Sequence, residues 1–205
     1  MALLGLWNKT YCAVRRLGLE DDMYQGRPII HRDSQVDGGV YLGGGQREAI
    51  VVDSKDPRIQ KLYDKAKRKI TINGIIIKDH LLRSVYESVA EAMPIQNSNS
   101  VMELVRNNNV ENDGKISLGF FLEAGIGVCR HDALACAVLL ELFKKEGHIN
   151  GKPSVDRNYL VFGGHAWCRY INSGDEKWII DVRQGYLGRL EDGLGIWPYN
   201  RQEDF

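Results

Sequence analysis

The run from Cys129 to Lys145, with the two strand-like stretches after it, constrains the fold more than any other part of the chain. The run is dense in good helix formers, and its apolar side chains cover a wide face at helical spacing. Residues 158–171 and 176–183 have the β-branched and aromatic content of strands, and Asn172–Asp175 between them is a turn sequence. We therefore predict a long helix packed against antiparallel strands.

Further helices are expected before this unit. Residues 53–69 and 79–93 carry apolar side chains at helical spacing, and a short helix is expected at 100–106 inside a polar loop. Residues 1–48 are punctuated by glycines and are expected to form an N-terminal extension of loops and short strands. The prediction is an α+β fold in which residues 49–205 form one domain, with helices packed on a small antiparallel sheet.

The composition is that of a globular protein. The 205 residues are enough to bury a core, and 43% of them are apolar. Basic and acidic residues balance at 27 each, so no general attraction to nucleic acid or to an anionic membrane is expected. No stretch approaches the roughly 20 apolar residues that a membrane-spanning helix needs. Neither a nucleic acid nor a membrane is therefore an expected partner.

The cysteines and the start of the chain bear on location. Cys12, Cys129, Cys136 and Cys168 are sparse and show no paired spacing, which favours free thiols in a reducing compartment. The apolar start lasts seven residues and has no cationic region before it, unlike a secretory signal. A cytoplasmic protein is expected. Delivery of a bacterial protein into a host cell without a cleaved signal fits the same features.

Cys129 has the setting of a nucleophilic thiol. It follows Gly125 and Gly127, which let the backbone turn sharply and let a substrate approach the sulfur. At the start of the predicted helix, free backbone N–H groups and the helix dipole stabilise a thiolate. The N–H of Cys129 itself is suited to stabilise an oxyanion. The alternative is a small buried side chain without a chemical role.

His165 and Asp181 complete a candidate catalytic triad with Cys129. Asp181 stands between Ile180 and Val182 in an otherwise apolar strand, where a carboxylate is costly to bury without a partner. The predicted hairpin brings Asp181 beside the imidazole of His165, and the carboxylate can then orient that imidazole towards a thiol. His131 lies two residues beyond Cys129 on the helix, so it points away and is a poor base for that thiol.

A zinc site is the competing interpretation of the same residue types. It would have to be assembled from Cys129, His131, Cys136, His165 and Cys168. No pair has the spacing of a structural zinc site, and Cys136 falls in the middle of the predicted helix. We therefore predict that the protein uses no metal and no cofactor.

At these positions the chain resembles the transglutaminase-like superfamily of papain-type fold. That superfamily has a cysteine that follows a glycine and opens a helix, then His-Ala-Trp on one strand, then an aspartate on the next strand after an aromatic residue. The matching segments are Gly127–Arg130, His165–Trp167 and Trp178–Asp181. The resemblance covers residues 115–183 closely and the helices at 53–93 more loosely, and it leaves residues 1–48 and 184–205 unexplained.

The resemblance implies a role for each residue. Cys129 would be the nucleophile, His165 the general acid and base, and Asp181 the group that orients the imidazole. Members of the superfamily commonly complete the oxyanion hole with an upstream tryptophan or glutamine, for which Gln96, or Asn97 beside it, is the candidate here. The residues expected to bind the substrate flank the triad in sequence and are Arg130, Trp167, Gly127 and Gly164.

The implied activity is attack of a thiol on an amide carbonyl of a protein or peptide, through a thioester. An amine acceptor would give glutamine crosslinking or amidation, and water would give deamidation or peptide cleavage. Transglutaminase-like acyl transfer or deamidation is the first expectation, and a cysteine peptidase of the same superfamily the second. Two other classes remain: a non-catalytic binding module of the same fold, and an arylamine-type acyltransferase, for which no coenzyme A groove is evident. The sequence does not indicate an oligomeric state.

Overall fold

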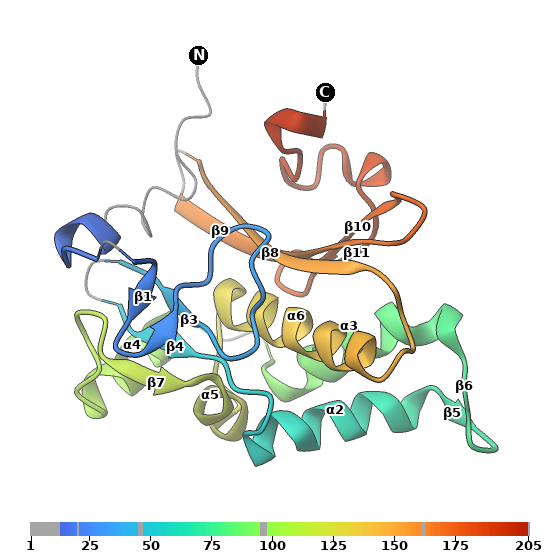
Figure 1. Cartoon of the computed structure of the whole chain (residues 1–205), viewed down its shortest axis with the longest axis horizontal. Helices are drawn as coiled ribbons and strands as arrows, with labels where there is room; N and C mark the ends of the chain where they lie inside the picture. Colours follow the sequence, from blue (N-terminus) through green and yellow to red (C-terminus); the bar gives the residue numbers. More distant parts are fainter. Residues whose placement is uncertain (1–12, 20, 45–46, 95–97, 161–162, 205) are drawn as a thin grey trace.

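The structure is a computed structural model of the chain (Figure 1). It describes residues 13–19, 21–44, 47–94, 98–160 and 163–204. One long helix, α6 (Cys129–Lys145), lies at the centre, between a four-stranded sheet and a layer of other helices. The protein is therefore of mixed α+β class, as predicted.

The main sheet consists of the C-terminal strands in the order β11-β10-β9-β8, all antiparallel. Their bounds are Lys152–Leu160 for β8, Gly163–Ile171 for β9, Lys177–Asp181 for β10 and Tyr186–Arg189 for β11. In β9, Cys168 and Tyr170 belong to the core that α6 fills, whereas Trp167 belongs to a separate cluster on the outer face. This alternation is the two-residue period of a strand, and it assigns His165 to the outer face.

The single strand predicted over 158–171 is wrong, because the chain reverses within that range. Residues up to Leu160 belong to β8 and pair with β9, which begins at Gly163. Gly163, the first residue of β9, has φ 128, a conformation that favours glycine. The turn predicted at Asn172–Asp175 is confirmed: the Asn172 N–H donates to the carbonyl oxygen of Glu176 at 3.0 Å, and Asp175 has φ 62.

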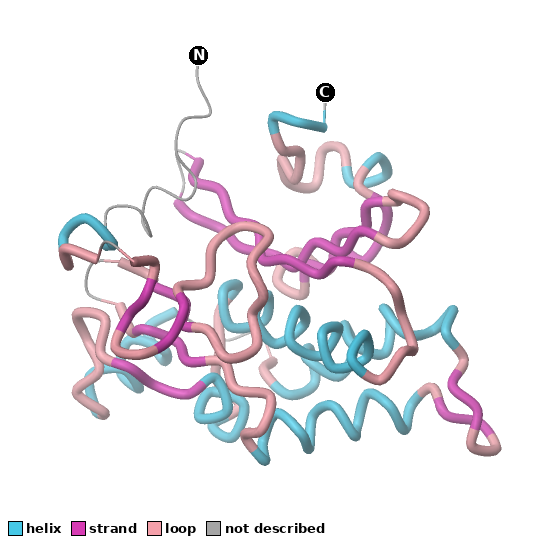
Figure 2. Tube along the Cα trace, viewed as in Figure 1, coloured by secondary structure: helices cyan, strands magenta, loops and turns pink. Residues whose placement is uncertain are grey.

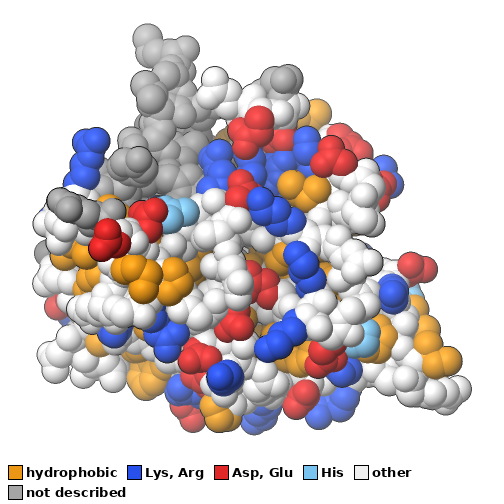
Figure 3. Space-filling view, viewed as in Figure 1, with side chains coloured by type: hydrophobic (Ala, Val, Ile, Leu, Met, Phe, Trp, Pro, Cys, Tyr) orange, Lys and Arg blue, Asp and Glu red, His pale blue; other side chains and the backbone are white. Residues whose placement is uncertain are grey.

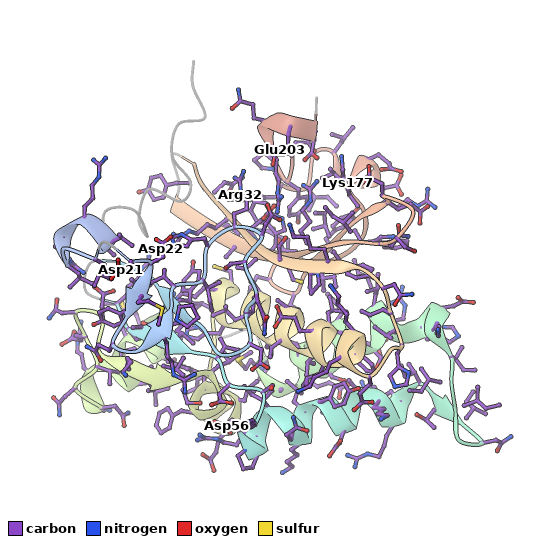
Figure 4. The ribbon with its side chains drawn as sticks, viewed as in Figure 1. Asp21, Asp22, Arg32, Asp56, Lys177 and Glu203 are labelled. Carbon is purple, nitrogen blue, oxygen red and sulfur yellow. The ribbon has the colours of Figure 1, made fainter. Side chains whose placement is uncertain are left out.

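Three helices cover the side of α6 that faces away from the sheet: α2 (Pro57–Lys69), α3 (Leu81–Ala92) and α5 (Leu118–Ala124). Asp56, labelled at the start of α2 in Figure 4, caps that helix by accepting a hydrogen bond from the Arg58 N–H. The predicted helices at 53–69 and 79–93 thus exist with slightly shorter bounds. The short 3-10 turn η1 (Lys78–His80) precedes α3.

A further helix and a short hairpin lie between α2 and β7 (Lys115–Ser117) in the sequence. The predicted helix at 100–106 is α4 (Ser98–Asn107), which extends slightly beyond the prediction at each end. Strands β5 (Thr71–Ile72) and β6 (Ile75–Ile76) form a hairpin that projects beyond the end of α2 (Figure 2).

The described part of residues 1–48 is built into the same domain as the rest of the chain. Strand β3 (Val40–Leu42) pairs with β4 (Ala49–Val51), and β4 pairs in parallel with β7 (Lys115–Ser117). The backbone N–H groups of Val36 and Asp37 donate to the Glu141 carboxylate in α6, each at 2.7 Å. A boundary between residues 48 and 49 would therefore divide a paired sheet. The hairpin of β1 (Met23–Tyr24) and β2 (Arg27–Pro28) precedes β3.

Residues 190–204, called the C-terminal segment below, cross the outer face of the main sheet, opposite α6 (Figures 1 and 2). The segment contains the 3-10 turns η2 (Glu191–Gly193) and η3 (Gln202–Asp204). Arg201 donates to both carboxylate oxygens of Asp156 in β8, at 2.7 and 2.5 Å. Arg169 in β9 donates to Asp204 at 2.9 and 2.6 Å, and Lys177 lies 3.0 Å from the same carboxylate (Figure 4). Buried ion pairs thus hold the segment on the sheet.

The surface carries both signs of charge. On the face seen in Figure 3, acidic and basic side chains are interspersed, in keeping with a net charge of zero. In the part of the chain that the structure describes, no helix combines the length and the apolar character needed to cross a membrane.

Candidate active site

Cys129 is the first residue of α6, and the start of that helix is tightly fixed. The Val128 N–H donates to Nδ1 of His131 at 3.1 Å, so the histidine caps the helix that carries the thiol. Gly127 is buried, and a Cβ there would lie 2.7 Å from the sulfur of Met93. The glycine before the cysteine therefore permits close packing beneath the helix start. The expected role of Gly127 in substrate binding would require an open surface, but Gly127 is buried.

A buried carboxylate holds the same helical turn from the other side. Glu48 is 1% exposed, and its Oε1 lies 2.6 Å from Nη2 of Arg130 and 3.2 Å from Nε2 of His131. Burial alone would raise the pKa of Glu48, but Arg130 and His131 lower it to about 2. Burial, together with the Arg130 cation, lowers the pKa of His131 to about 4, so its imidazole is neutral. His131 is a structural cap and does not act as a base for Cys129.

Arg183 joins the start of α6 to the end of β10. Its Nη2 donates to Asp132 Oδ1 at 3.0 Å and to the Met93 carbonyl oxygen at 3.2 Å, and its Nε contacts the same carboxylate. Asp132 is in the first turn of α6, and Arg183 follows Asp181 by two residues. This ion pair fixes the helix that carries the thiol relative to the strand that carries the candidate aspartate.

His165 and Asp181 form a short contact on the outer face of the sheet. Nε2 of His165 lies 2.5 Å from Oδ2 of Asp181, which is 1% exposed. Two further donors satisfy the carboxylate: the Tyr199 hydroxyl donates to Oδ2 at 3.0 Å, and the Gln184 N–H donates to Oδ1 at 3.1 Å. The buried aspartate thus has the partner that the sequence demanded, and two more that it did not reveal.

The thiol and the imidazole interact directly. Burial raises the pKa of the Cys129 thiol, but a hydrogen bond to His165 and its charge lower it below the ordinary value. Burial lowers the pKa of His165, but hydrogen bonds to Asp181 and to Cys129 raise it to about 9. Since Nε2 faces the aspartate, Nδ1 is the nitrogen left for the thiol. The three predicted residues are therefore brought together in the order thiol, imidazole, carboxylate.

Aromatic rings enclose the imidazole. Trp197 packs edge-on against His165 at 4.8 Å between ring centroids, and Trp167 stacks on it at 6.1 Å. Trp197 is held in turn by Asn158, which pairs with His165 in the sheet and accepts from the indole N–H at 2.6 Å. His165 is consequently 8% exposed, and its contact with Asp181 is shielded from water.

The residues expected to bind the substrate have other surroundings. Arg130 is 11% exposed and ion-paired with Glu48, and Trp167 is 3% exposed and packs edge-on against Tyr199. Gly164 is exposed at the start of β9, beside His165. Gln96 and Asn97, the oxyanion candidates, lie outside the described residues. Among the members of this set that the structure describes, Gly164 is the one that is exposed.

The other cysteines are not part of this centre. Cys136 and Cys168 are buried, and burial raises the pKa of each thiol, so both stay protonated. Among the described residues, no group of three or more histidine, cysteine or acidic side chains is arranged to hold a metal ion. Cys12 lies outside the described residues.

Sequence reasoning missed Tyr199, Trp197, Asn158 and Glu48. Each lies far along the chain from the residue it supports, and none belongs to a recognisable motif. The one available signal was the aromatic content of Trp197–Tyr199 near the C-terminus, which is unusual for a polar tail. Their contribution rests on contacts between distant segments, which spacing alone does not encode.

Tyr199→Phe is expected to lower the free energy of unfolding by about 1–3 kcal/mol, because it removes a donor from a buried carboxylate. Burial, with Asp181 nearby, raises the pKa of the Tyr199 hydroxyl, so it remains protonated and donates. Urea unfolding of both proteins measures the effect. Tyr186→Phe is the matched control. It keeps the ring that stacks on Tyr199 and removes only an exposed hydrogen bond from the Tyr186 hydroxyl to the Arg189 carbonyl oxygen. Equal stability of the two variants would contradict a role for Tyr199 in holding Asp181.

Comparison with models of known families, with curated proteins and with solved structures yields no match for this chain. The site therefore has to be interpreted from its own geometry.

Proposed function

We propose that the protein is a cysteine-dependent enzyme of the transglutaminase-like, papain-type class, which transfers or hydrolyses an acyl group at a protein or peptide amide. The observation that carries this proposal is the thiol of Cys129 at a helix start, hydrogen-bonded to an imidazole whose Nε2 lies 2.5 Å from the buried Asp181. A buried structural thiol needs neither partner. A thiolate–imidazolium pair needs both, because each charge is stabilised by the next group.

In the first half of the proposed reaction, the Cys129 thiolate attacks the carbonyl carbon of the amide. A C–S bond forms, and the carbonyl oxygen becomes an oxyanion. The first N–H groups of a helix have no partner inside it, so in the proposed reaction that of Cys129, the first residue of α6, donates to this oxygen. His165 then gives its proton to the amide nitrogen, the C–N bond breaks, and an amine or ammonia leaves a thioester on Cys129.

In the second half, the neutral His165 removes a proton from the acceptor, which attacks the thioester carbon. The C–S bond breaks, the thiolate returns, and the imidazole is again protonated. Water as the acceptor gives an acid, and a primary amine gives a new amide. Asp181 keeps the imidazole in the tautomer with its proton on Nε2, so that Nδ1 is free to accept the proton.

The arrangement of elements supports the papain-type assignment within the α+β class. The cysteine opens the central helix, the histidine lies near the start of the strand packed against that helix, and the aspartate ends the neighbouring strand. This order and these positions are what the resemblance implies.

The test is incubation of the protein with a glutamine-rich protein and a fluorescent primary amine. Amine incorporation into protein identifies acyl transfer, ammonia release without incorporation identifies deamidation, and new α-amino groups identify peptide cleavage. Cys129→Ala should abolish every one of these signals and should keep the thermal unfolding transition. Turnover by Cys129→Ala equal to wild type would refute the proposal, as would the absence of all three products together with an unreactive Cys129.

A further inference from the structure

Arg47 stands beside the first turn of α6. Its neighbour Glu48 reaches Arg130 and His131 in that turn, so the backbone at residue 47 runs along the helix start that carries Cys129. The backbone is anchored there as well, because the Arg47 carbonyl oxygen accepts a hydrogen bond from the Asp113 N–H at 2.7 Å. The backbone at residue 47 is thus held near the first turn of α6 by contacts on both sides of it.

The side chain of Arg47 has a defined direction. A Cβ on Gly43 would lie 3.0 Å from Cβ and 3.1 Å from Cδ of Arg47, so the arginine stem lies across the bare backbone of that glycine. Beyond the stem, the guanidinium is within electrostatic range of Tyr41 and of Cys129, and the Tyr41 hydroxyl accepts a hydrogen bond from Arg157 at 2.9 Å.

Arg47 differs from most arginines of this protein in having no carboxylate partner. Ten arginines in the described ranges form ion pairs, and Arg47 forms none there. The acid that interacts with it is Glu48, whose Oε1 is already shared by Arg130 and His131. The side chain is exposed, and Cys129 is half-buried. The N–H groups of the Arg47 guanidinium are therefore available, near the partly exposed thiol of Cys129, to bind a group that is not part of this chain.

We propose that Arg47 forms a subsite beside Cys129 for a carboxylate of the acyl donor, so that the preferred substrate carries an acidic group close to the amide that is attacked. A planar guanidinium binds a carboxylate through two parallel hydrogen bonds, which fixes orientation as well as charge. This inference rests on the proposed role of Cys129 as the nucleophile.

The test compares two alkylating reagents of similar size, anionic iodoacetate and neutral iodoacetamide. In each case the Cys129 thiolate attacks the CH₂ carbon, a C–S bond forms, and iodide leaves. The ratio of the two rates at Cys129, measured by peptide mass spectrometry, reports the local preference for a carboxylate. Changes in thiolate content alter both rates alike and cancel in the ratio.

We expect Arg47→Ala to lower this ratio by about threefold or more and Arg47→Glu to lower it further, whereas Arg47→Lys retains most of it. Arg68→Ala is the matched control, because Arg68 is an exposed arginine in the last turn of α2 without an ion pair among the described residues. About 1 M salt should shrink the difference between wild type and Arg47→Ala. A ratio unchanged in Arg47→Glu, or equal slowing of both reagents in Arg47→Ala, would overturn the subsite.

Peptide donors separate the two sources of the carboxylate. One glutamine peptide has glutamate beside the reacting residue and an amidated end, and a second has neutral neighbours and a free C-terminal carboxylate. The subsite predicts that one of them exceeds a fully neutral peptide in kcat/KM and loses this advantage in Arg47→Ala. An advantage that persists in the variant contradicts the proposal. Failure of the proposed function is a different result, namely a Cys129 that reacts slowly with both reagents.

Discussion

Replacing His165 by alanine is expected to slow the alkylation of Cys129 by iodoacetamide at about pH 6, by about tenfold for each unit by which the imidazole lowers the pKa of the thiol. Burial raises the pKa of this thiol, and only the hydrogen bond and charge of His165, helped by Arg130 and the Ala166 N–H, bring it below its ordinary value. Without the imidazole the thiol returns to a pKa of about 8.5 or higher, so less than about 1% of it is thiolate at about pH 6. Rates at each cysteine, followed by peptide mass spectrometry, measure the loss.

The dependence of the rate on pH has a definite sign. In the wild type, thiolate is present above the lowered pKa of Cys129, and the imidazole stays charged until its own pKa of about 9. The alkylation rate should therefore rise at a lower pH than that of an ordinary cysteine and stay high while the imidazole remains charged. In His165→Ala it should rise steadily with pH and approach the wild-type rate only when the free thiol ionises.

His148→Ala is the control for this experiment. His148 follows the C-terminal end of α6, is partly exposed and contacts Glu146, so it shares the helix with Cys129 but lies at the opposite end. Its replacement should leave the alkylation profile unchanged. Cys136 and Cys168 are internal references, since both are buried and should stay unmodified in every folded variant. A His165→Ala profile that overlays the wild type would remove the imidazole from the activation of Cys129.

The part of the site that is local in sequence could be predicted, and the reason is the regular geometry of helices and strands. The bounds of α6 agree with the prediction because good helix formers fill it from Cys129 to the lysines that face the C-terminal end of its dipole. The hairpin of β9 and β10 follows from its turn residues, and pairing then brings His165 and Asp181 to the same face. The two-residue period of a strand was sufficient to predict that these two side chains share a face of the sheet.

The supporting contacts could not be predicted, because they join segments that no pattern relates. Arg130 directly follows the cysteine and was expected to face the substrate, yet its partner Glu48 comes 82 residues earlier and buries it. Trp167 was expected at the groove, but the C-terminal segment covers it through Tyr199. The covering depends on buried ion pairs such as Arg201 with Asp156, 45 residues apart. Such ion pairs form only where the folded sheet brings the two segments together, so the spacing of the residues does not predict them.

These contacts also explain why a site of so few residues can be rigid. His165 is fixed at Nε2 by Asp181 and on its flanks by Trp197 and Trp167, while Asp181 is fixed by Tyr199 and the Gln184 N–H. The imidazole therefore has little freedom to rotate away from the thiol. Positioning of this kind is what converts a weak nucleophile into an efficient one.

Asp181→Asn is the second prediction with a large effect: we expect acyl transfer to fall by about 10⁴-fold with the fold retained. The Gln184 N–H donates to Oδ1 and fixes the oxygen of the asparagine amide on that side. The amide nitrogen then faces His165 where Oδ2 stands in the wild type. Because that nitrogen is a donor, Nε2 must become the acceptor and the proton moves to Nδ1, which can no longer take the proton of Cys129.

Two measurements separate this effect from simple destabilisation. The ¹⁵N chemical shifts of the His165 ring report which nitrogens carry a proton: both should carry one in the wild type, where the pKa of about 9 keeps the imidazole charged, whereas Nε2 should be unprotonated in Asp181→Asn. Asp156→Asn is the matched control, because Asp156 is also a buried carboxylate on the outer face of the sheet, but it binds Arg201 and does not touch His165. Asp156→Asn should lower the free energy of unfolding without changing which nitrogens of the His165 ring are protonated. A loss of activity in Asp181→Asn with both nitrogens of the His165 ring still protonated would show that the carboxylate does not act by selecting the protonated nitrogen.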